Sequence, residues 1–409
     1  MKYVKFIFLV GILVLLLSNC GVNTAPATPD SPVGPVVGIP GFPSVFKAST
    51  TDRNNDNISY QFDWGDGTAS AWSNFIPSGD TVSSSRLYLQ RGIYAVRVHA
   101  QDERDEMSGW SAPLYLMVGF PDTIVDSIET GNNPSNMEVL PNGQRIYVTN
   151  FNDGTVSVIS GSDHSVLGSI GVGNGPTGVA ALPNSQYVYV MVKGENYVLS
   201  LPTYSGPMDT IPVPDPCFAT AISSGEYVYV TSPSTGNVYV IQTSDNTVVD
   251  TIEVGGEPYT IAALPNGESI YVSTAPDTSY EIRTSDNTIV DTLLLGTKDM
   301  VFSLDGEYLY GCSPGLVFVV RTSDNIPVAA LEVGFEPVAL CVHPSGLLLY
   351  VAGYSSNTVS IICMPNNTII KEDIPVYDGP TCIAPSPNGE YIYVLLNRTN
   401  AVGVIGYSQ

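Results

Sequence analysis

Short segments in which polar and apolar residues alternate run through most of the chain. Ile58–Trp64 and Gly92–Val98 alternate in this way, and later stretches such as TVSVIS and NVYVIQT are strand-like as well. A two-residue period is typical of β-strands with one buried face, whereas an amphipathic helix repeats every three to four residues. Glycine and proline, with 38 and 31 residues, separate these segments at close intervals. The pattern therefore predicts an all-β protein of short strands and tight turns.

From about residue 122 onward, the pattern of strands repeats itself. Each repeat, about 40 residues long, contains four short strands and a turn such as TSDNT, which is the content of one propeller blade. The repeats begin with a Gly- or Pro-rich step at seven positions, namely Gly131, Gly173, Pro214, Gly255, Gly296, Gly334 and Tyr377. Seven repeats predict a seven-bladed β-propeller over residues 119–409.

The last repeat lacks its fourth strand. Gln409 comes directly after the third strand, Ala401–Ile405. A segment before the first repeat, 122–129, reads DTIVDSIE and matches fourth strands such as DNTVVDTIEV. Pairing these two segments closes the ring and removes two exposed sheet edges. We therefore predict that residues 122–130 complete the last blade.

The stretch RIYVTN and its flanks closely resemble the YVTN family of β-propeller repeats, which occurs in microbial surface proteins. Asn-Gly pairs at 142–143, 266–267 and 388–389 fit the hairpin turn between the first and second strands of a blade. The resemblance extends over essentially all of residues 122–409. It implies a surface-exposed propeller that often accompanies PKD-like domains, and it implies no single activity.

Residues 41–118 are a different unit. The string YQFDWGDG resembles the W-D-F-G-D-G signature of the polycystic-kidney-disease (PKD) repeat family, and RGIYAVRVHAQDE resembles a later strand of that family. Trp72-Ser73 and Trp110-Ser111 are more similar to fibronectin-III-like domains. Both resemblances imply a small Ig-like β-sandwich. The subtype of the sandwich stays open between them.

Asp52, Asn54 and Asp56 alternate in the polar stretch DRNNDN, and oxygen-bearing side chains at this spacing are possible calcium ligands. The stretch lacks the distal Glu and the spacing of a calcium-binding loop. Asn and Asp also favour turns, because their side chains bond the nearby backbone. We therefore interpret the stretch as an Asx-rich turn and predict no metal site.

Residues 1–19 have the pattern of a bacterial lipoprotein signal peptide. Two lysines precede an apolar run, Phe6–Leu17, that is too short for a comfortable membrane span. Cys20 follows in LSNC, which resembles a lipobox, the motif whose cysteine is lipidated and becomes the mature N-terminus. We therefore predict a membrane anchor at Cys20 on an extracytoplasmic protein, and a Pro-rich tether over residues 20–40. The alternative is an ordinary cleaved signal peptide with an incidental cysteine.

The formal net charge is −24, with 39 acidic side chains against 15 Lys and Arg. Such a surface repels phosphate backbones, so we expect no nucleic-acid partner. Beyond Cys20 the number of cysteines is odd and no C-x-x-C pair occurs. Because these cysteines lie in apolar, strand-like stretches, we expect buried thiols at Cys217, Cys312, Cys341, Cys363 and Cys382.

Catalytic motifs are absent from the sequence. It contains no G-x-S-x-G elbow, P-loop or H-E-x-x-H motif, and its three histidines lie in separate parts of the chain. The predicted innermost strands carry four titratable side chains, Glu138, Asp299, Asp305 and His343, which are scattered over three blades. We therefore predict no acid/base pair, no catalytic residue and no cofactor. A lactonase-like propeller hydrolase is the alternative.

One face of the predicted propeller carries variable loops. The turns after the first and third strands are monotonous, whereas the loops before the first strand and between the second and third strands vary. Variable loops with aromatic residues on a rigid scaffold are common binding sites. The candidate residues are Phe151, Asp215, Glu257, Tyr259, Asp299, Phe335, Glu336, Tyr354, Tyr377 and Asp378. We predict that this face binds a protein, peptide or glycan, and a purely structural envelope component is the remaining alternative.

Overall fold

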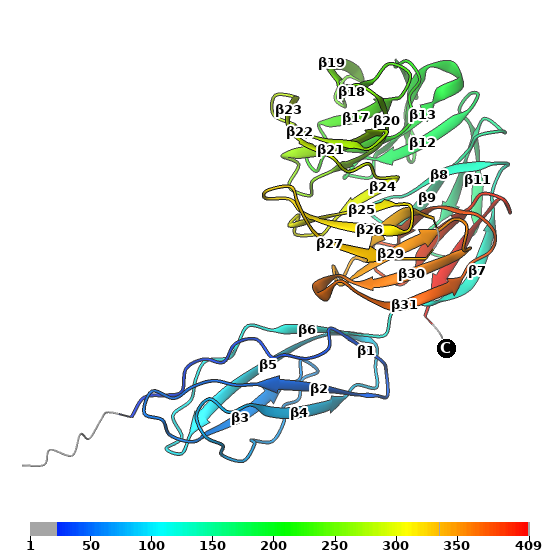
Figure 1. Ribbon diagram of the computed structural model, residues 1–409. Coiled ribbons are helices and arrows are strands. Elements are labelled where there is room, and N and C mark those ends of the chain that lie inside the picture. Colours follow the sequence, from blue (N-terminus) through cyan, green and yellow to red (C-terminus); the bar gives the residue numbers. More distant parts are fainter. Residues whose placement is uncertain (1–22, 335, 408–409) are drawn as a thin grey trace, which may run out of the picture. The chain divides into compact units, whose positions relative to one another are not determined.

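The computed structural model describes residues 23–334 and 336–407, and β-strands dominate this part of the chain (Figure 1). Two short 3-10 helices, η1 (Lys193–Glu195) and η2 (Met364–Asn366), accompany the strands in the described residues. The chain divides between Val118 and Gly119 into two compact units.

The first unit is a β-sandwich of two sheets. The larger sheet has the strand order β1-β6-β5-β3, and the smaller pairs β2 with β4. The strands are β1 (Val37–Gly38), β2 (Pro43–Ala48), β3 (Ile58–Asp63), β4 (Val82–Leu87), β5 (Gly92–Asp102) and β6 (Leu114–Val118).

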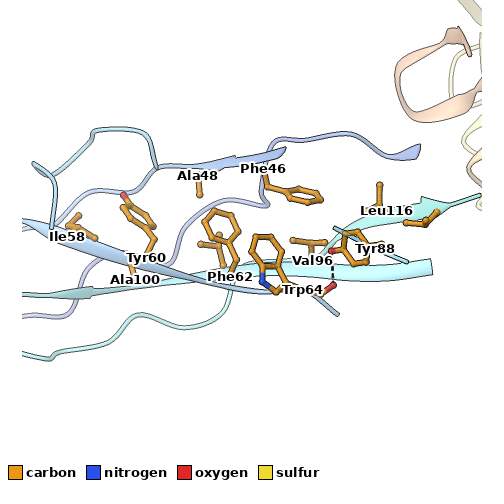
Figure 2. Close-up of a cluster of buried hydrophobic side chains, with 12 residues drawn as sticks. Phe46, Ala48, Ile58, Tyr60, Phe62, Trp64, Tyr88, Val96, Ala100 and Leu116 are labelled. Carbon is orange, nitrogen blue, oxygen red and sulfur yellow. Dashed lines mark hydrogen bonds between the residues drawn. The ribbon is translucent and has the colours of Figure 1, made fainter. Parts of the chain in front are cut away.

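Alternation along the strands fills the space between these two sheets with apolar side chains. Every second residue of β2 and β3 points inward, so that Phe46 and Phe62 lie on either side of Trp64 (Figure 2). The Phe62 and Trp64 rings stack with centroids 5.4 Å apart. The Tyr88 hydroxyl donates a hydrogen bond of 3.0 Å to the carbonyl of Trp64, which satisfies a buried phenol inside the core.

The prediction of a tether over residues 20–40 is wrong from residue 23 onward. Val33 bridges Lys47, and β1 adds to the larger sheet beside β6. Pro26, Pro29 and Pro32 are all buried. A spacing of three residues matches the turn of a polyproline II helix, so one face of the extended segment packs on the sandwich. Composition alone gave no sign of this period.

Two similar segments, SAWS (70–73) and SGWS (108–111), extend the edges of the larger sheet. The backbone N–H groups of Ser73 and Ser111 donate to the carbonyls of Tyr60 and Val98, each at 2.9 Å. The tryptophan of each segment lies against His99, with ring centroids 4.8 Å away for Trp72 and 3.8 Å for Trp110. The two motifs that suggested a fibronectin-like subtype therefore build one aromatic stack.

The second unit contains seven separate four-stranded sheets within the described residues. Their first strands are β8 (Pro134–Val139), β12 (Pro176–Ala181), β16 (Ala219–Ala221), β20 (Glu257–Ala263), β24 (Asp299–Phe302), β28 (Pro337–Val342) and β32 (Pro380–Pro385). Their second strands are β9 (Arg145–Asn150), β13 (Tyr187–Val192), β17 (Tyr227–Ser232), β21 (Ser269–Ala275), β25 (Tyr308–Ser313), β29 (Leu348–Gly353) and β33 (Ile392–Leu396).

The outer half of each sheet follows the same antiparallel order. The third strands are β10 (Thr155–Ser160), β14 (Tyr197–Pro202), β18 (Asn237–Gln242), β22 (Thr278–Arg283), β26 (Leu316–Arg321), β30 (Thr358–Cys363) and β34 (Ala401–Gly406). The fourth strands are β11 (Val166–Gly171), β15 (Asp209–Pro212), β19 (Thr247–Glu253), β23 (Thr288–Leu293), β27 (Ile326–Glu332), β31 (Thr368–Pro375) and β7 (Thr123–Glu129).

The first strands of the seven sheets lie around a common centre. Each contacts the first strand of the next sheet, and β32 contacts β8, so that the sheets follow one another in a cycle (Figure 1). The sheet order β32-β33-β34-β7 joins the C-terminal repeat to the strand before the first repeat. In this pair Ala401 lies opposite Glu129 and Gly406 opposite Thr123. The pairing predicted from the missing fourth strand is therefore present.

The second strand of each sheet carries a buried tyrosine that reaches toward the neighbouring sheet. The Tyr189, Tyr229 and Tyr271 hydroxyls donate at 2.7, 2.8 and 2.7 Å to the side-chain oxygen of an asparagine in the turn between the third and fourth strands of the next sheet. The accepting residues are Asn246, Asn287 and Asn325, all with positive φ. The repeated tyrosines and TSDN turns thus join neighbouring sheets, and we call this contact the Tyr–Asn latch.

Candidate ligand-binding site

A cavity of about 540 Å³ lies where the first strands meet. Its lining includes residues of β8, β12, β16, β20, β24, β28 and β32, so every sheet of the second unit contributes. Most of the lining is small or apolar, as with Val179, Ile261 and Ala339. This agrees with the character predicted for the innermost strands, and the few polar side chains present stand out against it.

Two carboxyl groups, Glu138 on β8 and Asp299 on β24, line this one cavity. Burial raises the pKa of Glu138 to about 8, against a hydrogen bond from the Ala181 backbone. Burial also raises the pKa of Asp299 to about 6, opposed by hydrogen bonds from the backbone N–H groups of Leu340 (2.8 Å) and Met300 (2.9 Å). At neutral pH, Glu138 is therefore mostly protonated and Asp299 mostly ionised. Sequence reasoning treated the two acids as scattered, but the fold brings both to the same space.

The other two titratable residues of the innermost strands are not among the residues that line the cavity. Asp305 accepts a hydrogen bond of 2.6 Å from the Ser303 hydroxyl in a turn. His343 is buried, with its Nε2 2.9 Å from the Gly389 carbonyl and its Nδ1 2.9 Å from the Ser345 hydroxyl. Burial lowers the pKa of His343. Both residues serve contacts within and between sheets.

Two thiols, Cys341 and Cys382, also line the cavity. Both are free, and burial raises the pKa of Cys382 to about 12 and that of Cys341 well above its ordinary value. They are therefore protonated at neutral pH. The five described cysteines are free, and three of them are buried, while Cys217 and Cys382 are half-buried. The prediction of buried thiols is therefore confirmed for Cys312, Cys341 and Cys363, whereas Cys217 and Cys382 are only half-buried.

Glu336 and Lys298 form an ion pair at the edge of the cavity, with Lys298 among the lining residues. The Nζ to Oε1 distance is 3.2 Å, and the Ser355 hydroxyl donates to the other carboxylate oxygen. The hydrogen bond from Ser355, followed by the one from Lys298, lowers the pKa of Glu336. The Glu336 carboxylate is thus held charged beside the cavity.

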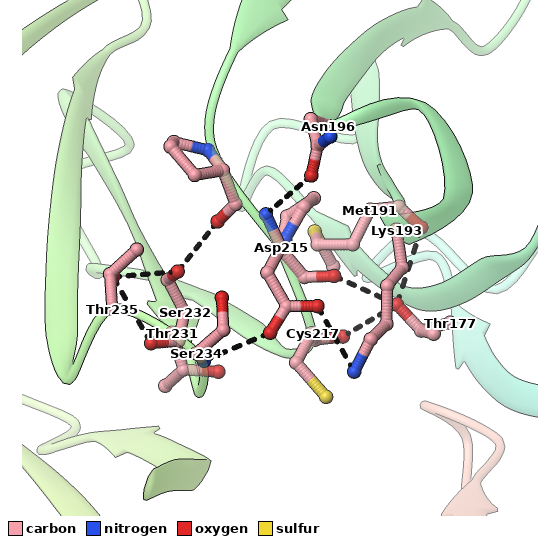
Figure 3. Close-up of polar contacts among 12 residues, drawn as sticks. Thr177, Met191, Lys193, Asn196, Asp215, Cys217, Thr231, Ser232, Ser234 and Thr235 are labelled. Carbon is pink, nitrogen blue, oxygen red and sulfur yellow. Dashed lines mark hydrogen bonds and ion pairs between the residues drawn. The ribbon is translucent and has the colours of Figure 1, made fainter. Parts of the chain in front are cut away.

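Asp215 fixes the loop between the second and third sheets (Figure 3). Its carboxylate lies 3.1 Å from the Lys193 ammonium and accepts a hydrogen bond of 2.9 Å from the backbone of Ser234. Burial acts to raise the pKa of Asp215, but hydrogen bonds from Ser234 and Lys193 outweigh it and lower the value. The Thr177 hydroxyl, within 3.1 Å of the Cys217 carbonyl, ties the same loop to the preceding sheet.

Asp378 forms the third ion pair of this face, at 2.7 Å from the Arg398 guanidinium. The same guanidinium lies over the Tyr354 ring, 4.7 Å from its centroid. Tyr377, next to Asp378, is 59% exposed. An arginine held by a carboxylate and an aromatic ring is pre-oriented, which lowers the entropy that a bound ligand must offset.

The remaining candidates make fewer contacts. The Tyr259 hydroxyl lies 3.5 Å from the Ser273 hydroxyl, Glu257 is exposed at the start of β20, and Phe151 is 38% exposed. Phe335 and Cys20 lie outside the described residues.

Sequence reasoning found the acids of this face but missed the cations that pair with them, Lys193, Lys298 and Arg398. A usable signal was present in the sequence. Residues 119–409 contain seven Lys or Arg residues in all, and three of them fall in the variable loops.

Two absences concern the residues that the structure describes. Within 23–334 and 336–407, no three His, Cys, Asp or Glu side chains gather as a group that could hold a metal ion. In the same ranges no helix is both long enough and apolar enough to span a bilayer.

The described residues form an all-β protein in which a sandwich precedes seven four-stranded sheets. The profile of the PKD domain matches residues 31–110, so this part of the chain is a PKD domain, a type that is typically extracellular. A chain of hydrazine synthase from Kuenenia stuttgartiensis, with a propeller-like fold, is similar to this protein at a TM-score of 0.63 and 18% identity. The similarity covers 68% of this chain and 97% of that chain and concerns the fold alone. No curated protein matches the chain in sequence.

Proposed function

We propose that this protein is an extracytoplasmic binding module that holds a protein, peptide or glycan ligand at the rim of its central cavity. The observation that carries the proposal is a cavity of about 540 Å³ whose lining includes Glu138, Asp299 and Lys298, with Lys298 paired to Glu336. A cavity of several hundred Å³ accommodates a side chain or a sugar unit, and specificity then comes from a few fixed polar groups. Glu138 as a donor and Asp299 as an acceptor supply two such groups at neutral pH.

An array of peptides and glycans probed with the protein lacking residues 1–20 would identify the ligand. Tyr354→Ala combined with Tyr377→Ala should then weaken binding of that ligand about thirtyfold or more, because aromatic anchors carry much of the binding energy at interfaces. Asp286→Ala, in a turn between β22 and β23, is the control and should bind like the parent. Binding lost only in the control would place the site on the opposite face.

The proposed architecture is a seven-bladed propeller of the YVTN type whose last blade is closed by β7. Seven four-stranded sheets in a cycle and the pairing of β34 with β7 support it. A closed ring of blades gives a rigid platform on which loops of one face converge toward the central cavity. This is the geometry that the proposed binding mode requires.

The proposed location is the cell envelope, with a lipid anchor on Cys20. The extracellular character of PKD domains and the lipobox-like LSNC sequence support it. Cys20→Ser should yield a protein that no longer partitions into the detergent phase, because each buried acyl CH₂ contributes roughly 0.8 kcal/mol to membrane binding. Unchanged partitioning of the variant would exclude Cys20 as the anchor.

A lactonase-like hydrolase is the second candidate function, and one observation favours it. Glu138 and Asp299 line the same cavity with their pKa values pushed apart, which is the pattern of a general acid beside a general base. Lactone hydrolysis that disappears in both Glu138→Gln and Asp299→Asn would support the enzyme. Ligand binding without hydrolysis by the parent would support the binding module instead.

A further inference from the structure

One corner of the PKD domain holds three buried oxygen atoms that have no hydrogen-bond donor. They are Oδ1 of Asn23, Oδ2 of Asp52 and Oδ2 of Asp56, and they make up half of the six such side-chain atoms in the described residues. A buried acceptor without a partner destabilises the folded state, and a charged one does so more strongly. Three in one corner therefore call for a positively charged partner.

The turn that follows β2 uses only one oxygen of Asp52. Oδ1 accepts hydrogen bonds from the backbone N–H groups of Asn54 at 2.7 Å and Asp56 at 3.2 Å, which is the Asx turn that the sequence predicts. The residue is 6% exposed, so its second oxygen is buried with it. The Asx turn and a cation on the second oxygen are therefore compatible.

A second turn of the same form shows how such an aspartate is satisfied. Asp102 accepts hydrogen bonds from the backbone of Arg104 at 2.8 Å and Glu106 at 3.0 Å through Oδ1, and Asp105 has the same positive φ as Asn55 in the first turn. Its Oδ2, however, receives the Asn23 amide at 2.6 Å. The Asp52 turn has no such donor, and this difference marks it as the turn that needs an external partner.

Asn23 stands between the two turns with its amide in a defined orientation. Its Nδ2 must face Asp102, because the reverse orientation would bring two acceptor oxygens together. Its Oδ1 is therefore turned away from Asp102. The next residue, Thr24, bonds the Asn54 side chain in the Asp52 turn through its backbone and its hydroxyl, at 3.1 and 2.8 Å. Asn23 is thus tied to both turns.

The side-chain cations near these turns leave the two carboxylates unpaired. Arg53 and Arg104 are exposed, and neither takes part in an ion pair with Asp52 or Asp56. The ion pair of this unit joins Arg86 to Asp66, which follows β3. A buried carboxylate without a counter-charge is unstable, so a bound cation is the natural partner.

We propose that this corner binds one calcium ion, with the Asp52 and Asp56 carboxylates and the Asn23 amide oxygen as ligands. Ca²⁺ takes six to eight oxygen ligands and accepts carboxylates, amide and backbone carbonyls and water together. Two carboxylates are fewer than in a tight calcium loop, which suits the about 10⁻⁴–10⁻³ M affinity of extracellular modules. The ion joins the segment that begins at Asn23 to the sandwich, and it is independent of the ligand-binding rim.

The tryptophans of the chain allow this unit to be observed alone. All three, Trp64, Trp72 and Trp110, lie in the PKD domain. Tryptophan emission during heating of the full chain therefore reports the unfolding of this domain. About 5 mM CaCl₂ should raise the midpoint by about 4–8 °C over the same protein in EGTA. Equilibrium dialysis should give one bound ion per chain.

Asp56→Asn is the mildest variant, because the Asp56 side chain makes no hydrogen bond within the described residues. It should lose most of the calcium-induced shift, and Asp52→Asn should lose all of it. Asp80→Asn, an exposed change of equal charge in the same domain, should keep the full shift. Calcium dialysis of the parent keeps the proposal testable even where a variant unfolds. Absence of binding by the parent, a shift retained in both variants, or an equal shift with MgCl₂ would overturn the proposal.

Discussion

At the scale of single residues, the main finding is that sequence-distant groups meet. Glu138 and Asp299 are 161 positions apart, yet both line the central cavity. Lys193 lies between two strands of the second sheet and pairs with Asp215 in the loop to the third sheet, while Lys298 and Glu336 precede the first strands of two successive sheets. A sequence shows which acids stand at the start of each repeat, but it shows no pairing between repeats, because such pairs depend on loop conformation. The acids were therefore predictable and their partners were not.

Glu138 should make the stability of the protein depend on pH. Its folded-state pKa of about 8 lies above its ordinary value of 4.5, so the folded state holds a proton that the unfolded state releases above pH 4.5. Stability from this group is present below pH 4.5 and falls as the pH rises to about 8. Glu138→Gln keeps the hydrogen-bond acceptor and removes the titration. Relative to the parent, it should gain on the order of 2 kcal/mol in unfolding free energy between pH 5 and pH 8.

Urea unfolding at both pH values measures this gain. Glu332→Gln, an exposed glutamate of β27, is the matched control and should show no such change. If Glu138→Gln follows the parent at both pH values, then Glu138 is not buried in the way described.

At the scale of elements, the Tyr–Asn latch explains why the TSDN turn recurs from one repeat to the next. The asparagine of the TSDN turn adopts a positive φ, accepts from the tyrosine of the preceding sheet, and in Asn287 also donates at 2.8 Å to Asp250 on the fourth strand of that sheet. The recurrence of these residues was visible in the sequence and was interpreted as structural. What they contact was not visible, because the partner lies one repeat away.

Asn287→Ala should destabilise the second unit by about 2–3 kcal/mol. The change leaves the buried Tyr229 hydroxyl without its acceptor and places a Cβ-bearing residue with no local hydrogen bond at a φ of 55°. Calorimetry of the full chain measures the effect. Tryptophan emission, recorded separately, identifies which of the transitions belongs to the PKD domain.

His164 supplies the matched comparison, since it takes the place of the asparagine in the first sheet. Its φ is 61°, its Nε2 lies 3.4 Å from the Tyr393 hydroxyl, and its Nδ1 lies 3.5 Å from Asp126 on β7. His164→Asn should therefore change the unfolding free energy by less than about 1 kcal/mol. A loss as large as that of Asn287→Ala would show that the two positions are not equivalent.

At the scale of the whole molecule, the sequence predicted the number and order of strands well because the pattern recurs. The first strand of each repeat, its hairpin turn and the borrowed strand β7 all follow from one period. The segment 23–40 was misjudged because it occurs once, and its three-residue burial period is visible only against the sandwich. Repetition thus decided which parts of the fold could be predicted.

Removal of β7 should cost the second unit much of its stability. A protein beginning at Gly131 lacks the partner of β34, which exposes a full row of backbone groups next to buried side chains such as Val402 and Val404. We expect aggregation, or a thermal unfolding midpoint that is lower by about 10 °C or more. Such a shift corresponds to a loss on the order of several kcal/mol in the free energy of unfolding. A truncated protein that melts with the midpoint of the second unit in the parent would contradict closure by β7.

The position of β7 also has a mechanical consequence. For a chain held at its N-terminus, tension passes from β6 through a few residues into Thr123, the first residue of β7. Because Thr123 lies opposite Gly406 in an antiparallel pair, the pull acts on the hydrogen bonds one after another from that end, and not on the whole row in shear. Strands that are peeled in this way yield at lower force than strands that slide. We therefore expect β7, the strand that pairs with β34, to be the first element of the second unit to detach under load.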